Sequence, residues 1–170
     1  AYPFSDYPQT VTHGSHVAGI AAGKGGMAPE ASIIAVQVFS QYLYKDQSGT
    51  RWATTAAFDS DYLKGLDYIY GLAQEGVPIA AVNLSLGSGK YYAVCDDSDR
   101  LGISALFRRL NELGIAVVTA AGNSGTDKGY DGWISAPACY SGSFTVSALD
   151  YHDGKPKIAD YSSYNDLVDL

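Results

Sequence analysis

The chain has 170 residues, of which 46% are apolar, so it is long enough for one cored domain and too short for two to be expected. Its 11 basic and 18 acidic side chains give a net charge of -7, which argues against binding to nucleic acid or to anionic membrane surfaces. No apolar run of about 18 residues is present, and residues 1–6 lack the features of a secretory signal.

The first half of the chain contains two predicted helices and one predicted strand. The first helix is expected to begin near Thr12, a good N-cap residue, and to run to Ala22 before a glycine-rich break. A nearly continuous apolar run predicts a buried strand over residues 32–39, and the composition of residues 41–55 predicts a loop. A second helix is expected after Asp59 and Ser60, its candidate caps, and its apolar stripe consists of Tyr62, Leu66, Ile69 and Ala73.

The second half of the chain alternates apolar runs with one more helical pattern. The runs over residues 79–86, 115–121 and 143–149 are nearly continuous, which predicts strands covered on both faces. Between the first two runs, residues 103–113 carry an apolar stripe of helical period that ends at Gly114. Strand alternating with helix predicts an α/β fold built on a parallel sheet.

Two predicted loops follow directly after strands of this sheet. Residues 87–100 and 125–140 are rich in Gly, Ser, Asp and Tyr. In an open parallel sheet the functional site is formed by loops that leave the carboxyl ends of the strands. We therefore expect functional residues in or just before these two stretches.

His13 is the first candidate for chemistry. It is expected in the opening turn of the first helix, where the helix dipole favours a neutral imidazole and hence a general base. The alternative is a structural histidine that bonds a helix end. His16 is expected to pack on the same helix face. The helix of zinc proteases spaces its two histidines four residues apart with a glutamate between them, whereas these two histidines are three apart with Gly14 and Ser15 between them, so we expect no metal here.

Asn123 is the second candidate, because it follows the predicted strand over residues 115–121. A side-chain amide at a strand end can be aimed at a developing oxyanion, although Asn-Ser-Gly is also an ordinary turn sequence. Residues 83–87 end the preceding strand and could hold an extended peptide by main-chain hydrogen bonds. Each segment taken singly also has a purely structural explanation.

Taken together and in this order, these segments resemble the motifs of the subtilisin-like serine proteases, the subtilase family. The family motifs H-G-T-H-V-A-G, N-M-S-L-G and A-A-G-N-x-G are similar to residues 12–19, 83–87 and 119–125. Its Y-P-A, V-G-A and F-S-S-x-G segments are similar to residues 136–138, 145–148 and 161–164. The resemblance spans essentially the whole chain.

The resemblance implies a subtilisin-like α/β fold, with a parallel sheet in three layers and helices on both faces. Residues 1–170 would be the central part of the catalytic domain of a serine endopeptidase, without its first strands and C-terminal part. His13 would act as base and acid, and Asn123 would bind the oxyanion. Ser135 would form the floor of the pocket for the residue before the cleaved bond. The rest of the substrate site would be Ser85, Leu86, Gly87, Ala120, Ala121 and Gly122.

The resemblance also bears on the two cysteines and on cofactors. It places the loops of Cys95 and Cys139 on one pocket rim, which implies a disulfide, with two unpaired thiols as the alternative. Some family members hold a weak cation near the positions of Ala138, Tyr140 and Asp169, but too few oxygens are identifiable to assign one, and no cofactor is expected. The implied substrate is a polypeptide, and the implied location is secreted or cell-surface.

Two parts of the family's catalytic triad are not found among these residues. The aspartate belongs to a D-[ST]-G segment before the histidine, and Asp6 is followed by Tyr7-Pro8, so it is not assigned. The serine belongs to a G-T-S-M-A segment that the sequence does not contain. We therefore expect this chain to be inactive alone and to be completed by the remainder of its own domain.

The missing aspartate strand also leads to an expectation about the sheet. In the family it lies between the strands expected over residues 32–39 and 79–86, so these should pair directly or another segment or chain should fill the slot. The alternative function is a non-catalytic subtilase-like module that binds peptides or partners through the same groove. A nucleotide-binding domain would need a glycine-rich turn before the first helix, whereas residues 23–26 lie after it.

Overall fold

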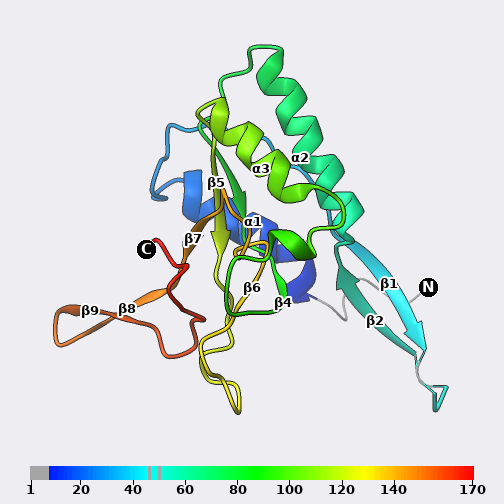
Figure 1. Ribbon diagram of the computed structural model, residues 1–170, viewed down its shortest axis with the longest axis vertical. Helices are drawn as coiled ribbons and strands as arrows, with labels where there is room; N and C mark the ends of the chain where they lie inside the picture. Colours follow the sequence, from blue (N-terminus) through cyan, green and yellow to red (C-terminus); the bar gives the residue numbers. More distant parts are fainter. Residues whose placement is uncertain (1–7, 46, 50) are drawn as a thin grey trace. The chain divides into compact units, whose positions relative to one another are not determined.

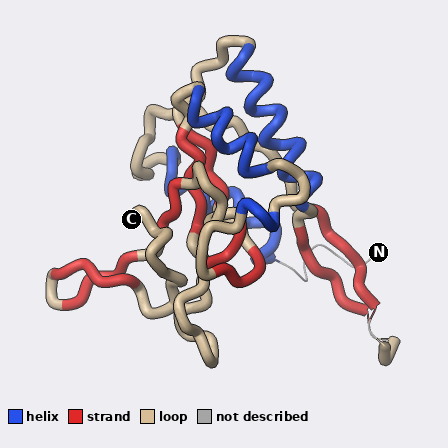
Figure 2. Tube along the Cα trace, viewed as in Figure 1, coloured by secondary structure: helices blue, strands red, loops and turns tan. Residues whose placement is uncertain are grey.

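The computed structural model describes residues 8–45, 47–49 and 51–170 (Figure 1). The chain divides into two compact units, Ala1–Gly65 and Leu66–Leu170, and each is described by itself. Figure 2 distinguishes their helices, strands and loops along the trace. Within the described residues, no helix has the length and apolar character needed to cross a membrane.

The first unit opens with α1 (Pro8–Ala22), which begins earlier than predicted. Pro8 suits a first helical position, because its fixed φ is helical and its missing N–H would have no intrahelical partner there. Thr12 is therefore inside the helix and not at its start, and the predicted N-cap is wrong. The helix ends at Ala22, just before the glycine-rich break, as expected.

A hairpin replaces the loop that was predicted over residues 41–55. Strands β1 (Ser40–Lys45) and β2 (Arg51–Ala56) pair antiparallel. The stretch contains tyrosine, tryptophan and threonine, which favour strands, and its Gly and Ser residues concentrate in the connection between them. The ring of Tyr42 packs edge-on against Phe58, with 5.2 Å between centroids.

Residues 32–39 do not form the strand that their apolar run predicted. Ile33 and Ile34 are about half exposed. Val36 and Val38 pack against Gly65 of α2 (Asp59–Gln74), because a Cβ added at Gly65 would lie 3.1 Å from a methyl group of each valine. An apolar run becomes a buried strand only when neighbouring strands supply a ladder. In the described part of the chain, these residues have no ladder partner.

Helix α2 includes both candidate caps, Asp59 and Ser60, in its first turn, so it begins slightly earlier than predicted, and it runs from the first unit into the second. Asp59 and Asp61 lie in its first turn, where carboxylates interact favourably with the helix dipole. Tyr62 and Leu66 are buried, which confirms the start of the predicted apolar stripe.

The second unit is built on a parallel sheet of three strands in the order β3-β5-β7. The strands are β3 (Ala81–Leu84), β5 (Ala116–Ala120) and β7 (Phe144–Val146), and both pairings are parallel. The predicted α/β class and parallel sheet are confirmed. Burial alternates along the strands, so the continuous burial expected from their composition is not observed.

Helix α3 (Ile103–Glu112) packs against β5, and Figure 1 shows it alongside that strand. Its buried apolar residues are Ile103, Leu106, Phe107 and Leu110, which have the predicted helical spacing. The helix ends just before Gly114, also as predicted. This helix and β5 form the core that holds the strand end at Asn123.

One antiparallel pair interrupts the stretches that were predicted as loops, and a second antiparallel pair follows the parallel sheet. Strand β4 (Ser88–Tyr91) pairs with β6 (Ile134–Ala136), and β8 (Leu149–His152) forms a hairpin with β9 (Lys155–Ile158). Strand β3 forms one edge of its sheet within the described residues of the second unit. Residues 32–39 belong to the first unit, so the expectation that the two segments pair directly, or that another segment or chain fills the slot, stays a prediction.

Asp99 caps α3 from the preceding turn. Its carboxylate accepts hydrogen bonds from the backbone N–H groups of Ser104, at 2.6 Å, and Leu101, at 3.2 Å. Partial burial acts to raise the pKa of this carboxyl, but the hydrogen bonds from Ser104, Ile103 and Leu101 outweigh it, so the pKa lies below its usual value.

Because this pKa is lowered by folding, the stabilisation from Asp99 should be complete above the ordinary value of 3.8 and lost as pH falls below it. We expect Asp99→Ala to lower the free energy of unfolding by about 1 kcal/mol at pH 7. Urea unfolding at pH 7 and near pH 2 checks this, with Asp97→Ala as an exposed carboxylate control. A difference between Asp99→Ala and the unsubstituted chain that persists unchanged in acid would contradict the capping role.

Candidate active site

The carboxyl ends of β3 and β5 bring the two main predicted segments together. Leu84 and Thr119 are partners in the parallel register, so Ser85 and Ala120 continue from neighbouring points of the sheet. Ser85 and Leu86 are half-buried, and Gly87 is exposed. The structure therefore places the predicted substrate-binding residues of both strands at one edge, as expected for a parallel sheet.

Ser135, the predicted pocket floor, lies against both segments. Its backbone N–H donates to the carbonyl of Ala121 at 2.9 Å. A Cβ added to Gly87 would lie 2.9 Å from Ser135 Cβ, and one added to Gly122 would lie 3.1 Å from Ser135 Oγ. Gly122 also has a φ of 123°, which side-chain-bearing residues rarely adopt. Both positions therefore require glycine so that the chain can approach Ser135 closely.

Asn123 follows directly, where the chain leaves this packed region. Its side chain is exposed, and within the described residues its amide has no hydrogen-bond partner. The neighbouring peptide groups, in contrast, are held by Ser163, which bonds the carbonyl of Gly122 and the N–H of Ser124. The result is an anchored backbone that presents an available amide donor.

Two residues of this region received no role from the sequence. Asn83 Nδ2 donates to Ser85 Oγ at 2.9 Å and so orients the start of the predicted substrate segment. Ser163 is fully buried and contacts both sides of Asn123. Both belong to stretches that match family motifs, and that membership was the signal that could have identified them.

A disulfide between Cys95 and Cys139 ties the rim of the site, as the resemblance implied. Their Cα atoms are 5.4 Å apart, and the Cys95 N–H donates to the Cys139 carbonyl at 3.0 Å. Next to it, the Asp96 carboxylate accepts the N–H of Ser141 at 2.8 Å and pairs with Arg108 Nη1 at 3.1 Å. These contacts join the loop after β4 to the loop after β6.

We expect loss of this disulfide to destabilise the chain markedly. Replacing Cys95 and Cys139 together by serine should lower the free energy of unfolding by about 2–4 kcal/mol, because the unfolded chain regains the freedom of a long loop. Urea unfolding measures the change. A reducing agent should weaken the unsubstituted chain by a similar amount and leave the double variant unaffected, and equal stability of the two chains would overturn the prediction.

Two side-chain contacts reinforce the same rim. Lys90 Nζ lies 3.7 Å from the centroid of the Trp133 ring, a cation–π contact between β4 and the residue before β6. Tyr92 Oη donates to Asp131 Oδ1 at 2.9 Å. This hydrogen bond, with a smaller effect of burial and of the Asp131 charge, raises the pKa of the Tyr92 phenol.

His13 lies in the first unit, and the residues described above belong to the second. It is exposed and lies in the second turn of α1, because the helix begins at Pro8. The predicted influence of the helix dipole is therefore wrong, since that influence falls off within the first turn. His16 is also exposed, which contradicts its expected packing.

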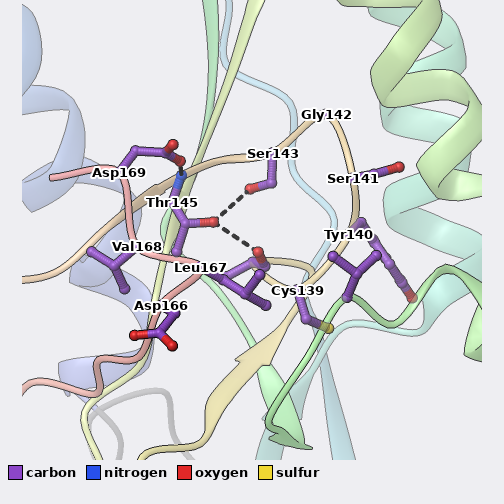
Figure 3. Close-up of a pocket in the computed structure, with 12 residues that line it drawn as sticks. Cys139, Tyr140, Ser141, Gly142, Ser143, Thr145, Asp166, Leu167, Val168 and Asp169 are labelled. Atoms are coloured by element: carbon purple, nitrogen blue, oxygen red, sulfur yellow. Dashed lines mark hydrogen bonds between the residues drawn. The ribbon is translucent and has the colours of Figure 1, made fainter.

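The residues named for a weak cation line one cavity of about 260 Å³ (Figure 3). The Ala138 carbonyl accepts the Thr145 hydroxyl at 2.7 Å, and Asp169 Oδ2 accepts the Thr145 N–H at 2.8 Å. The carboxylates of Asp166 and Asp169 do not converge in Figure 3. No His, Cys, Asp and Glu cluster suited to a metal occurs among the described residues. Because Ca²⁺ takes six to eight oxygen ligands, we assign no cation here.

Comparison with known proteins places these features in a family. The sequence profile of the subtilase family matches residues 1–170. Subtilisin-like proteinase Mp1 of Magnaporthiopsis poae is 32% identical over 171 residues, covering 100% of this chain and 37% of that protein. Thermitase of Thermoactinomyces vulgaris is 34% identical over 169 residues, covering 93% of this chain and 47% of that protein.

A solved structure shows the same fold. The prenylagaramide maturation protease PagA matches with a TM-score of 0.58 at 20% identity, over 92% of this chain and 49% of that one. This chain therefore spans less than half the length of each of these three relatives. The family profile covers the strand ends and glycines that build the site as well as the helix that carries His13, and the chain belongs to the subtilase family.

Proposed function

We propose that this chain is the central part of a serine endopeptidase, and that Asn123 stabilises the oxyanion of the tetrahedral intermediate. The observation that carries the proposal is the available amide of Asn123 at the end of β5, beside backbone held at fixed positions. An amide donor in a preorganised backbone stabilises developing charge without reorganisation during the reaction.

In the complete protein, His13 would accept the proton of a serine hydroxyl as that oxygen attacks the peptide carbonyl. The negative charge that forms on the carbonyl oxygen would be bound by the Asn123 amide. His13 would then protonate the departing amine, and water would release the acyl group by the same route in reverse. The serine and the aspartate of this triad would come from outside the residues printed here.

The substrate would be a polypeptide in extended form along Ser85–Gly87, with the residue before the cleaved bond entering the space next to Ser135. The Ser135 hydroxyl lies close to Gly87 and Gly122, which supports a pocket of moderate size and slight polarity for that residue. The disulfide supports a secreted or cell-surface location, because such bonds persist in oxidising compartments.

A fluorophosphonate probe on the complete protein tests the proposal. The probe should label a serine in the unsubstituted protein, and labelling should be lost in His13→Ala but retained in His152→Ala, which changes an exposed histidine of β8. Peptides with Ala, Ser, Thr, Phe or Arg before one bond should then be cleaved, and mass spectrometry should find the smaller residues preferred.

A folded protein that takes no label and cleaves no peptide would overturn the proposal. If such a protein still bound extended peptides, with loss of binding in a Gly87→Val variant, the non-catalytic binding module would be the correct function instead. A Cβ at position 87 would lie 2.9 Å from Ser135 Cβ, so this variant displaces the backbone of the proposed peptide-binding segment.

A further inference from the structure

Ser163 holds the peptide groups on both sides of Asn123. Its N–H donates to the carbonyl of Gly122 at 2.9 Å, and its Oγ accepts the N–H of Ser124 at 3.1 Å. Ser163 is 0% exposed. One buried residue therefore anchors the backbone immediately before and immediately after the proposed oxyanion donor.

The next residue adds a third anchor from the same segment. The N–H of Gly125 donates to the carbonyl of Tyr161 at 2.9 Å. A Cβ at Gly125 would lie 2.5 Å from the carbonyl oxygen of Ser162, so the two stretches of backbone are in close contact. Residues 161–163 thus support the chain continuously from Gly122 to Gly125.

Ser163 is itself held in place. Ser147 Oγ donates to the carbonyl of Ser163 at 2.7 Å, and this bond is buried. On its other side, Ser163 Oγ lies 2.9 Å from where a Cβ of Gly122 would stand. A side chain with so little free space transmits its own position to the residues it contacts.

The function of Asn123 requires such support, because no described residue holds its side chain directly and its direction depends on the backbone on either side. An oxyanion donor is effective when it already points to where the negative charge will form. The peptide groups on either side of Asn123, which determine its backbone direction, both form hydrogen bonds with Ser163.

We propose that Ser163 is a positioning residue that aims the Asn123 amide at the oxyanion site. The proposal rests on the proposed endopeptidase function and deepens it. Loss of the Ser163 hydroxyl frees the Ser124 N–H, so the amide points correctly for a smaller fraction of the time. The effect falls on the transition state, because only there is the negative charge present.

The test compares Ser163→Ala with Ser104→Ala in the complete protein. Ser104 is the control, because it is also a buried serine, is 5% exposed, and uses its hydroxyl in a hydrogen bond to Asp99. Both variants lose a buried hydroxyl, and only Ser163→Ala loses a contact to the Asn123 backbone.

We expect Ser163→Ala to lower kcat about tenfold with KM unchanged, which is part of the 10²–10³ that one oxyanion donor contributes. Affinity for a peptide aldehyde, which becomes tetrahedral when bound, should fall by the same factor. Ser104→Ala should keep the kcat and the aldehyde affinity of the unsubstituted protein. Equal kcat values for the two variants, or a change confined to KM, would overturn the positioning role.

Hydrogen exchange followed by mass spectrometry provides a readout that does not depend on turnover. Ser163→Ala should speed exchange in a peptide spanning residues 122–126, and Ser104→Ala should leave exchange in that peptide unchanged. Unchanged exchange at 122–126 in Ser163→Ala would also overturn the role. If the unsubstituted protein neither cleaves peptides nor takes the fluorophosphonate, the endopeptidase proposal fails, whereas activity with no difference between the variants removes the positioning role alone.

Discussion

Replacing Asn123 by alanine in the complete protein should lower kcat by about 10²–10³ and leave KM nearly unchanged. The amide is exposed at the end of β5, so the substitution removes little packing and the free energy of unfolding should stay within about 0.5 kcal/mol of the starting value. Steady-state kinetics on a peptide substrate and urea unfolding measure the two quantities separately.

A second exposed asparagine provides the control for this experiment. Asn111 donates its side-chain amide to the carbonyl of Gly142 at 2.8 Å, away from the strand ends that form the site. Asn111→Ala should leave kcat unchanged. If Asn123→Ala kept full activity, or lost it only through unfolding, Asn123 would be a turn residue and the oxyanion role would be wrong.

Phe107→Ala should produce the largest loss of stability, about 3–5 kcal/mol, because it removes a large side chain from a core with no access to solvent. Phe107 is 0% exposed in α3, and its ring packs edge-on against Tyr140, with 6.0 Å between centroids. Urea unfolding monitored by circular dichroism measures the change. In a protein of ordinary marginal stability, this loss brings much of the population close to unfolding.

The C-cap of the same helix provides a position for comparison. Leu113, directly after α3, is 47% exposed, and its replacement by alanine should change the free energy of unfolding far less than the Phe107 substitution. Similar losses for the two variants would mean that the helix is not held by its buried face. The packing of α3 on β5 would then not be the source of stability at this end of the sheet.

Elements with strong local signals were predictable from the sequence. Helices α2 and α3 have an apolar stripe of helical spacing, and each has its predicted start or end within a residue or two. The hairpin of β1 and β2 was missed because its polar composition outweighed its tyrosines and threonines. Residues 32–39 were predicted as a strand from composition alone, although strand formation depends on a neighbour that composition does not reveal.

The candidate site also has parts that the sequence predicts and parts that it does not. Its strand-end segments could be identified because motif order along the chain coincides with adjacency in a parallel sheet, as Leu84 and Thr119 illustrate. The hydrogen bonds of Ser163 with Gly122 and Ser124 could not be predicted, since they join residues about forty positions apart in the chain. The same holds for the contact of Arg108 with Asp96, which depends on how α3 packs.

The cross-linked rim also affects how this protein would survive in the presence of proteases. Cleavage of a folded chain requires a segment to open locally into an extended form that a protease can accept. The loop after β4 and the loop after β6 are joined by the disulfide and by the hydrogen bonds of Asp96, so neither can open without the other. If the proposed endopeptidase function holds, the protein would thereby resist self-digestion at the loops that border its proposed substrate site.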